Sequence, residues 1–105
     1  MREFKLGCYQ AWIDTHVPFE ETLAECTLWS RVMREAFPEL IHVGGYVRAK
    51  KTPFFSVFNL NYHEYLITED GDIVDPTAIQ FDKLIGEGNW YYERWEEHLI
   101  DRRYL

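Results

Sequence analysis

Residues 62–81 of this chain read YHEYLITEDGDIVDPTAIQF, and this stretch decides the fold. The β-prone residues on both sides of Asp70-Gly71 predict a hairpin. Pro76 ends its second arm, because proline has no backbone N–H to donate to a strand ladder. The hairpin carries His63 on one arm and Asp75 on the other, so it can orient an imidazole.

The loop between the two arms decides whether these side chains meet. A two-residue turn would put Asp75 opposite Leu66, on the other face of the hairpin from His63. A three-residue loop, with Gly71 in the left-handed conformation, puts Asp75 opposite Tyr65 instead. His63 is then a diagonal neighbour on the same face, about 7–8 Å away between backbones and within reach of a side-chain hydrogen bond. Contact between the two side chains therefore requires the three-residue loop.

Composition limits the class of protein. The chain has 105 residues, 47% hydrophobic and 17% aromatic, which predicts one folded domain over residues 1–105 and excludes a disordered chain. The formal net charge of −7 disfavours a general grip on nucleic acid phosphates. No apolar run follows the charged N-terminus, and no segment approaches about 18 consecutive apolar residues. We therefore expect a cytoplasmic protein without a membrane span, in which Cys8 and Cys26 are free thiols.

The spacing of apolar residues becomes helical over residues 19–37. The apolar face is formed by Leu23, Cys26, Ser30, Met33 and Phe37 and is widened by Leu28, Trp29, Val32 and Ala36. Two starts are open: a helix with Pro18 in its first turn, or a capping box over residues 22–25 with its threonine as N-cap. The second start puts Cys26 at the fourth helical position, near the positive end of the helix dipole. The helix should end before Pro38, which disfavours a helical residue in front of it.

Several stretches outside this helix have the composition of strands. They are residues 40–48, residues 54–61 and the two hairpin arms, 62–68 and 72–75. Gly44 and Gly45, in the middle of the first stretch, predict a bulge or a close approach of another backbone. The basic pair Lys50-Lys51 fits either a solvated turn or a contact with an acidic partner.

The two ends of the chain differ in how clearly they can be interpreted. Residues 1–13 fit either a strand or a helix. Residues 89–105 place Tyr92, Trp95 and Leu99 on one helical face, which predicts a C-terminal helix. The whole pattern predicts an α+β fold, in which a helix carrying the second cysteine packs on a mostly antiparallel sheet.

The sequence predicts no metal site and no cofactor. His63-Glu64 begins like the zinc motif His-Glu-x-x-His, but residue 67 is isoleucine. Asp70, Asp72 and Asp75 do not have the spacing of a calcium loop. The glycines form no phosphate-binding pattern.

A cysteine, a histidine and an aspartate suggest a different chemistry. Nucleophilic catalysis by cysteine needs a thiolate, a base that shares its proton and a group that fixes the base. Near a helix N-terminus the pKa of Cys26 would be lowered, and backbone N–H groups there can stabilise an oxyanion. The simpler alternative is that Cys26 is a small apolar side chain on a buried helix face. Cys8 is a weaker candidate nucleophile, because no clear helix start follows it.

The order of these residues resembles a known family. Cys26 at the head of a helix is followed by Gly45-Tyr46, His63-x-Tyr65 and Asp75-Pro76-Thr77, as in the transglutaminase-like branch of the papain-like fold. The similarity covers residues 22–81 and extends to small bacterial and phage-borne proteins of that fold. It implies a papain-like core in which Cys26 attacks an amide of a protein or peptide. The histidine would then shuttle the proton and the aspartate would orient the histidine.

The resemblance also suggests roles for two further residues. Gln10 is a candidate donor to the oxyanion, the role that a glutamine upstream of the cysteine has in papain-like enzymes. Tyr65, where the family has tryptophan, is a candidate for the substrate side of the site. Two residues depart from the pattern: Glu25 replaces a glycine and Glu64 replaces an alanine. A carboxylate close to a cysteine raises the pKa of the thiol and opposes activation.

Two functions follow from this reading. The first is a cysteine-dependent acyl transferase or hydrolase of the peptidase, deamidase or transglutaminase type. The second is a catalytically inactive module of the same fold that binds a protein partner. Its acidic, aromatic-rich surface would then provide Trp90, Tyr91 and Trp95 as anchors.

Overall fold

Three α-helices and one four-stranded sheet make up the computed structural model, within residues 2–22, 25–50 and 60–101, the residues that the structure describes. The elements are α1 (Arg2–His16), the 3₁₀ turn η1 (Phe19–Glu21), α2 (Cys26–Ala36), β1 (Ile41–Ala49), β2 (Leu60–Ile67), β3 (Ile73–Val74), α3 (Ile79–Leu84) and β4 (Trp90–Leu99). All neighbouring strands pair antiparallel, in the order β3-β2-β1-β4. The expected α+β class is confirmed. Most of the strand expected at 54–61 lies outside the described residues.

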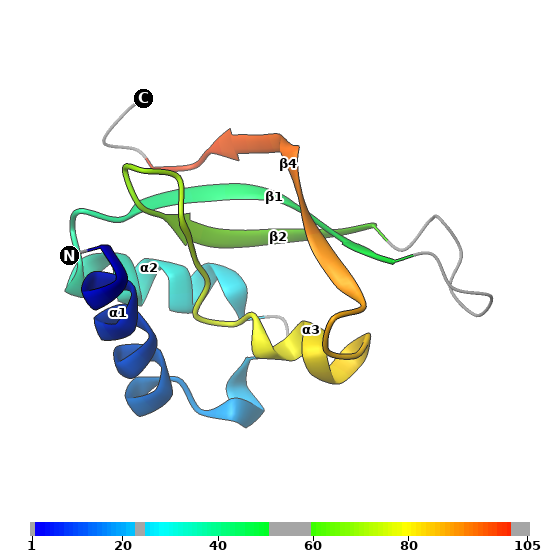
Figure 1. Cartoon of the computed structure of the whole chain (residues 1–105), viewed down its shortest axis with the longest axis horizontal. Helices are drawn as coiled ribbons and strands as arrows, with labels where there is room; N and C mark the ends of the chain where they lie inside the picture. The colour runs from blue at the N-terminus through cyan, green and yellow to red at the C-terminus, as the bar shows by residue number, and fades with distance from the viewer. Residues whose placement is uncertain (1, 23–24, 51–59, 102–105) are drawn as a thin grey trace.

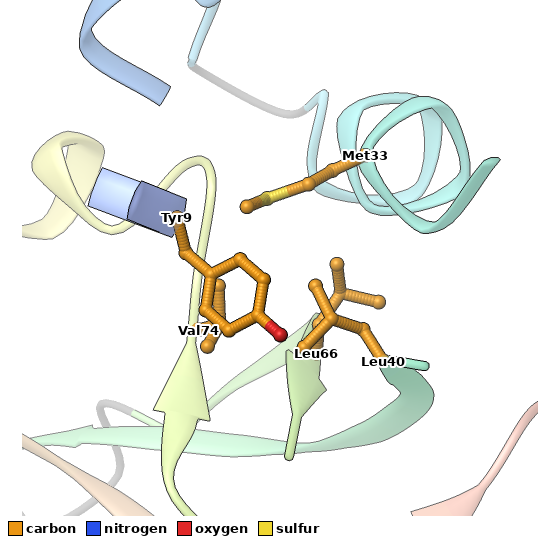
Figure 2. Close-up of a cluster of buried hydrophobic side chains, with 5 residues drawn as sticks. All are labelled: Tyr9, Met33, Leu40, Leu66 and Val74. Atoms are coloured by element: carbon orange, nitrogen blue, oxygen red, sulfur yellow. The ribbon is translucent and has the colours of Figure 1, made fainter. Parts of the chain in front are cut away.

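Helices α1 and α2 lie on one side of the sheet (Figure 1). A cluster of buried side chains joins them to it, and its members are Tyr9, Met33, Leu40, Leu66 and Val74 (Figure 2). Full burial of an apolar side chain of this size contributes roughly 1.5–3 kcal/mol to stability. The cluster therefore holds α2 against β2, the strand that carries His63. No helix among the described residues is long and apolar enough to cross a membrane.

The ambiguous N-terminal stretch forms the helix α1, which continues to His16. Its buried residue is Tyr9, and Leu6 and Ile13 pack against the same cluster from one turn before and one turn after it. The Tyr9 hydroxyl donates to the Glu39 carboxylate at 2.8 Å, which satisfies its polar end. A helix is favoured here because one of its faces packs on the hairpin residues Leu66 and Val74.

Helix α2 begins later than either start expected from the sequence, because its first residue is Cys26. Residues 19–21 form a separate 3₁₀ turn. The Thr22 hydroxyl donates to the backbone oxygen of Phe19 at 2.9 Å. Thr22 therefore closes that turn and is not the N-cap of α2, so the predicted capping box is wrong.

The buried face of α2 is narrower than its composition suggested. Ser30 and Met33 are fully buried, whereas Leu28 and Val32 expose 52% and 37% of their surfaces. The predicted widening of the apolar face is therefore wrong for Leu28, Val32 and Ala36, which are exposed, whereas Trp29 is half-buried. The end of the helix at Ala36, ahead of the proline, agrees with the prediction.

The predicted C-terminal helix is wrong, because residues 90–99 form strand β4 against β1. Tyr92 is half-buried, Trp95 is 77% exposed and Leu99 is 38% exposed, so the three do not share a buried face. Aromatic residues favour strands. Pairing with β4 also satisfies the backbone groups along an edge of β1 that would otherwise be unpaired.

The glycine pair of β1 marks an irregularity in the sheet. The register between β1 and β4 shifts between Gly44 and Tyr46, and residues 94–97 of β4 lie opposite Gly45 alone. A Cβ atom on Gly45 would lie 3.2 Å from the Tyr65 hydroxyl. The expected bulge is confirmed, although the extra residues belong to β4, and the atom that approaches Gly45 most closely belongs to a side chain and not to a backbone.

Candidate active site

The hairpin has the three-residue loop that was predicted from the sequence. The Thr68 N–H donates to the Asp72 oxygen at 2.9 Å, and the Gly71 N–H donates to the Thr68 oxygen at 3.0 Å. Gly71 has a φ of +87°, in the left-handed region that favours glycine. The register of β2 and β3, continued by one residue, brings Asp75 opposite Tyr65 as expected.

The carboxylate of Asp75 meets the His63 imidazole. The Nε2 atom of His63 lies 2.6 Å from Asp75 Oδ2, and the same oxygen accepts a hydrogen bond from the Tyr92 hydroxyl at 2.7 Å. The other oxygen accepts from the Thr77 N–H at 3.0 Å. The His63 and Asp75 side chains are 1% and 2% exposed. A buried carboxylate needs partners on both oxygens, and this one has them.

The Asp75-Pro76-Thr77 segment is a closed turn that leads from β3 into α3. Pro76 and Thr77 are fully buried. The Thr77 hydroxyl accepts a hydrogen bond from the Gln80 side chain at 3.0 Å. The turn is thereby tied to the first residues of α3, which limits the positions that the Asp75 carboxylate can take.

The His63 imidazole lies among three aromatic rings. The ring of Tyr65 stacks on it at 5.7 Å, the ring of Phe81 meets it edge-on at 4.7 Å, and the ring of Tyr92 lies 6.4 Å away. Burial lowers the pKa of His63, but the charge and hydrogen bond of Asp75, with a smaller contribution from the facing thiol, raise it to about 9. His63 is therefore protonated at neutral pH.

Cys26 is the first residue of α2 and is half-buried. Its thiol faces the His63 imidazole closely enough for each group to shift the pKa of the other. Because Nε2 is taken by Asp75, Nδ1 is the ring nitrogen left for the sulfur. Burial raises the pKa of Cys26, but the contacts with His63 and with the Glu64 N–H outweigh it, and the pKa is lowered. The pair is thus biased towards thiolate and imidazolium.

The N-terminus of α2 offers hydrogen-bond donors beside the sulfur. The Trp29 N–H bonds to the Glu25 oxygen at 3.1 Å, and the N–H groups of residues 26–28 precede this first turn and have no partner within the helix. Glu25 occupies the N-cap position without a side-chain capping bond. These N–H groups can therefore stabilise a thiolate or an oxyanion.

The Glu64 carboxylate is bound by groups other than the thiol. The Thr27 hydroxyl donates to its Oε2 atom at 2.8 Å, and His42 Nε2 lies 2.8 Å from its Oε1 atom. That second contact lacks the angles of a hydrogen bond. The charge of Glu64 raises the pKa of Cys26, although other contacts outweigh it. This departure from the family pattern opposes activation without reversing it.

A groove of about 470 Å³ begins next to these residues and follows α2. Thr27 and Glu64 line one part of it, and Arg34 and Asp101 line another. Cys26 itself does not line this groove, although the next residue in the chain, Thr27, does.

The two residues expected at the oxyanion or substrate side lie apart from the thiol contacts described above. Gln10 is exposed on α1 and its amide donates to Asp14 at 2.9 Å. Tyr65 is fully buried, and its hydroxyl donates to Glu97 at 2.5 Å while its ring supports His63. Their roles towards an oxyanion or a substrate stay predictions.

The other candidates are exposed. Cys8 lies on α1, and it and Cys26 are both free thiols, as expected. The Lys50 N–H donates to the Asn89 oxygen at 2.7 Å, which places this residue at the end of the β1–β4 ladder. Lys51 lies outside the described residues.

The sequence reading missed Tyr92 and His42. Tyr92 was assigned to a helix, and the aromatic run at residues 90–92 is the signal that favoured a strand. Nothing in the sequence around His42 indicates a contact with Glu64. No cluster of three or more side chains that could hold a metal ion occurs in the part of the chain that the structure describes.

The structure places Cys26, His63 and Asp75 in series: the thiol faces the imidazole, and the imidazole is hydrogen-bonded to the Asp75 carboxylate. They come from the start of α2, from β2 and from the turn after β3. Such a series can supply a thiolate and a protonated imidazole at neutral pH. Comparison of the chain with protein-family models, with curated proteins and with solved structures finds no match in any of the three.

Proposed function

We propose that this protein is a cysteine-dependent acyl-transfer enzyme that acts on an amide of a protein or peptide. The observation that supports it is the series from the Cys26 thiol through His63 to Asp75. A lowered cysteine pKa beside a raised histidine pKa is the pattern of an activated nucleophile. We also propose a reducing cytoplasm as its location, because the nucleophile must remain a thiol.

In the first half of the reaction, the Cys26 thiolate attacks the carbonyl carbon of the amide, and the oxyanion forms near the first N–H groups of α2. The imidazolium of His63 then gives its Nδ1 proton to the leaving nitrogen. The C–N bond breaks, ammonia or an amine departs, and a thioester remains on Cys26.

In the second half, water or a primary amine attacks the thioester. Neutral His63 takes a proton from the attacking group, and the thiolate leaves as the C–S bond breaks. Asp75 keeps the imidazole oriented through both halves and stabilises the imidazolium. Hydrolysis, deamidation and transglutamination share these steps and differ in the leaving group and the acceptor.

We further propose that the domain has a papain-like core in its transglutaminase-like form. The support is the order of elements: a helix that begins at Cys26, a strand with Gly45-Tyr46, a strand with His63, and a turn with Asp75. The departures at Glu25 and Glu64 do not remove any of these parts.

Iodoacetamide alkylation tests the activation of Cys26 without a known substrate. Mass spectrometry of the digested protein follows Cys26 and Cys8 in the same sample. At pH 6–7 we expect Cys26 to react at least about tenfold faster than a model thiol, although it is half-buried, because the thiolate is the reactive form. Cys8 is the exposed internal reference. If Cys26 reacts no faster than the model thiol, the proposed function is wrong.

Three assays on one protein substrate, dimethylated casein, distinguish deamidation, transfer to an amine and proteolysis. Released ammonia reports attack on glutamine, incorporation of a fluorescent primary amine reports transfer to an amine, and new peptide ends report proteolysis. Each signal should be absent in Cys26→Ala.

A binding function is the second candidate, and the observation that favours it is Trp95, which is 77% exposed on β4. Tyr91 is 42% exposed, whereas Trp90 donates from its indole to Asp82 at 2.8 Å and is half-buried. An exposed tryptophan is a frequent anchor in protein interfaces. A biological effect that survives Cys26→Ala would favour binding over catalysis.

A further inference from the structure

The hydroxyl of Tyr92 reaches the candidate site from β4, a strand that carries none of the three residues in the series. Tyr92 pairs with Val47 of β1, and its hydroxyl donates to Asp75 Oδ2 at 2.7 Å. His63 Nε2 lies 2.6 Å from the same oxygen. Two donors therefore converge on one carboxylate oxygen, while the other oxygen is bound by Thr77.

The Tyr92 hydroxyl remains a hydrogen-bond donor while His63 titrates. Burial raises the pKa of Tyr92, and the charge and hydrogen bond of Asp75 raise it further. The hydroxyl therefore keeps its proton over the range in which His63 titrates. The ring packs at 4.9 Å from the ring of Tyr65 and at 5.1 Å from that of Trp90, which restricts its rotation.

We propose that Tyr92 is a positioning residue, which holds the Asp75 carboxylate and draws off part of the negative charge that Asp75 presents to His63. A hydrogen bond to a carboxylate stabilises its charge and weakens its hold on a second donor. With Tyr92 in place, the His63 imidazolium should thus release its proton more readily. That proton is the one the leaving nitrogen needs, so the catalytic meaning of this inference rests on the proposed function.

The other groups that face His63 do not share this position. Cys26 faces the imidazole from the start of α2 and does not contact Asp75 in the bonds described above, and Phe81 from α3 carries no charge. Tyr65 stacks on the imidazole, but its hydroxyl donates to Glu97. Of the polar groups facing His63, Tyr92 is therefore the one whose hydroxyl lies on the shared oxygen of the His63–Asp75 pair.

The substitution Tyr92→Phe removes the hydroxyl and keeps the ring. The titration of His63 is followed by NMR in the full chain with labelled histidine, and folding is checked by circular dichroism. We expect the pKa of His63 to rise by about 0.5–1 unit above its value in the parent, because Asp75 regains its full charge towards the imidazole. In amide turnover, the alkaline limb of the pH profile should move upward by the same amount.

Tyr91→Phe is the matched control. Tyr91 is the neighbouring residue of β4, is 42% exposed, and has its hydroxyl 3.4 Å from Glu93. Its removal should leave the titration of His63 unchanged. If Tyr92→Phe does not fold, 3-fluorotyrosine placed at position 92 keeps the shape and makes a stronger donor. The pKa of His63 should then fall.

A folded Tyr92→Phe protein in which His63 titrates as in the parent, or shifts no more than in Tyr91→Phe, overturns the inference. The same holds if 3-fluorotyrosine leaves the titration unchanged. This outcome is distinguishable from failure of the proposed function. Slow alkylation of Cys26 in the parent would refute the proposed enzymatic function. The His63 titration would still report whether Tyr92 acts on Asp75.

Discussion

Two buried histidine–carboxylate pairs lie close together in this protein and behave in opposite ways. His63 lies 2.6 Å from Asp75, and His42 lies 2.8 Å from Glu64. The two imidazoles are 1% and 5% exposed. Yet the pKa of His63 is raised to about 9, whereas the pKa of His42 is lowered.

The surroundings of each carboxylate explain the difference. Burial disfavours both imidazolium ions. Asp75 is held by a closed turn, and its charge and hydrogen bond to His63 outweigh the cost of burying that imidazolium. For His42, burial outweighs the nearby charges of Glu64 and Asp101, which raise its pKa, and the positive charge of Arg34 lowers the pKa further. A short distance to a carboxylate therefore does not by itself charge a histidine, because the cost of burial can outweigh the attraction.

The largest expected effect comes from removing one imidazole at a time. In His63→Gln, alkylation of Cys26 by iodoacetamide at pH 6–7 should fall at least about tenfold, because the cation that stabilises the thiolate is lost. In His42→Gln it should change by less than about twofold, since a neutral ring is replaced by a neutral amide. An equal fall in both variants would show that the two pairs do not differ as described.

A smaller effect should come from the carboxylate that opposes activation. Glu64→Gln removes a negative charge that raises the pKa of Cys26, so alkylation at pH 5–6 should become about two- to fivefold faster. Glu25→Gln is the matched control, because Glu25 is exposed and directly precedes the cysteine. A larger gain in Glu25→Gln than in Glu64→Gln would identify Glu25 as the opposing charge.

The smallest effect concerns stability in acid. The pKa of His42 is lowered on folding, so its contribution is fully present above its ordinary pKa of about 6.5 and is lost as the pH falls below that value. The reason is that His42 binds a proton in the unfolded chain at a pH at which it stays neutral in the folded protein. The free energy of unfolding, measured in urea at pH 7, 6 and 5, should decrease as the pH falls. His42→Gln should make this decrease smaller by at most about 2 kcal/mol. Parallel curves for the two proteins would contradict the lowered pKa.

The hairpin was predictable in detail because its geometry is local. Side chains alternate along a strand, so the loop type alone decides whether His63 and Asp75 share a face. Gly71 supplies the left-handed residue that the three-residue loop needs. The residue types suggested a contact of Cys26 with His63 but left a buried, inert cysteine open, because α2 and β2 are far apart in the chain and their packing is not encoded locally.

The C-terminal strand shows where sequence reasoning failed. The spacing of Tyr92, Trp95 and Leu99 fits a helix, and the interspersed charges fit its solvated face. The spacing of apolar residues in one segment does not indicate that β1 has an unpaired edge. Nor does it indicate that residues 94–97 bulge opposite Gly45. The contact of Tyr92 with Asp75 depends on both features.

Sequence alone determined the α+β class, the end of α2 and the loop that puts His63 beside Asp75. These depend on backbone preferences and hydrogen bonds between residues close in the chain, whose outcome is encoded locally. Only the tertiary structure decided where α2 begins, that β4 is a strand, and that Tyr92 and His42 reach the two carboxylates. Those outcomes depend on burial and pairing between distant segments, because the free energy of an edge or a cavity exists only once the other elements are in place.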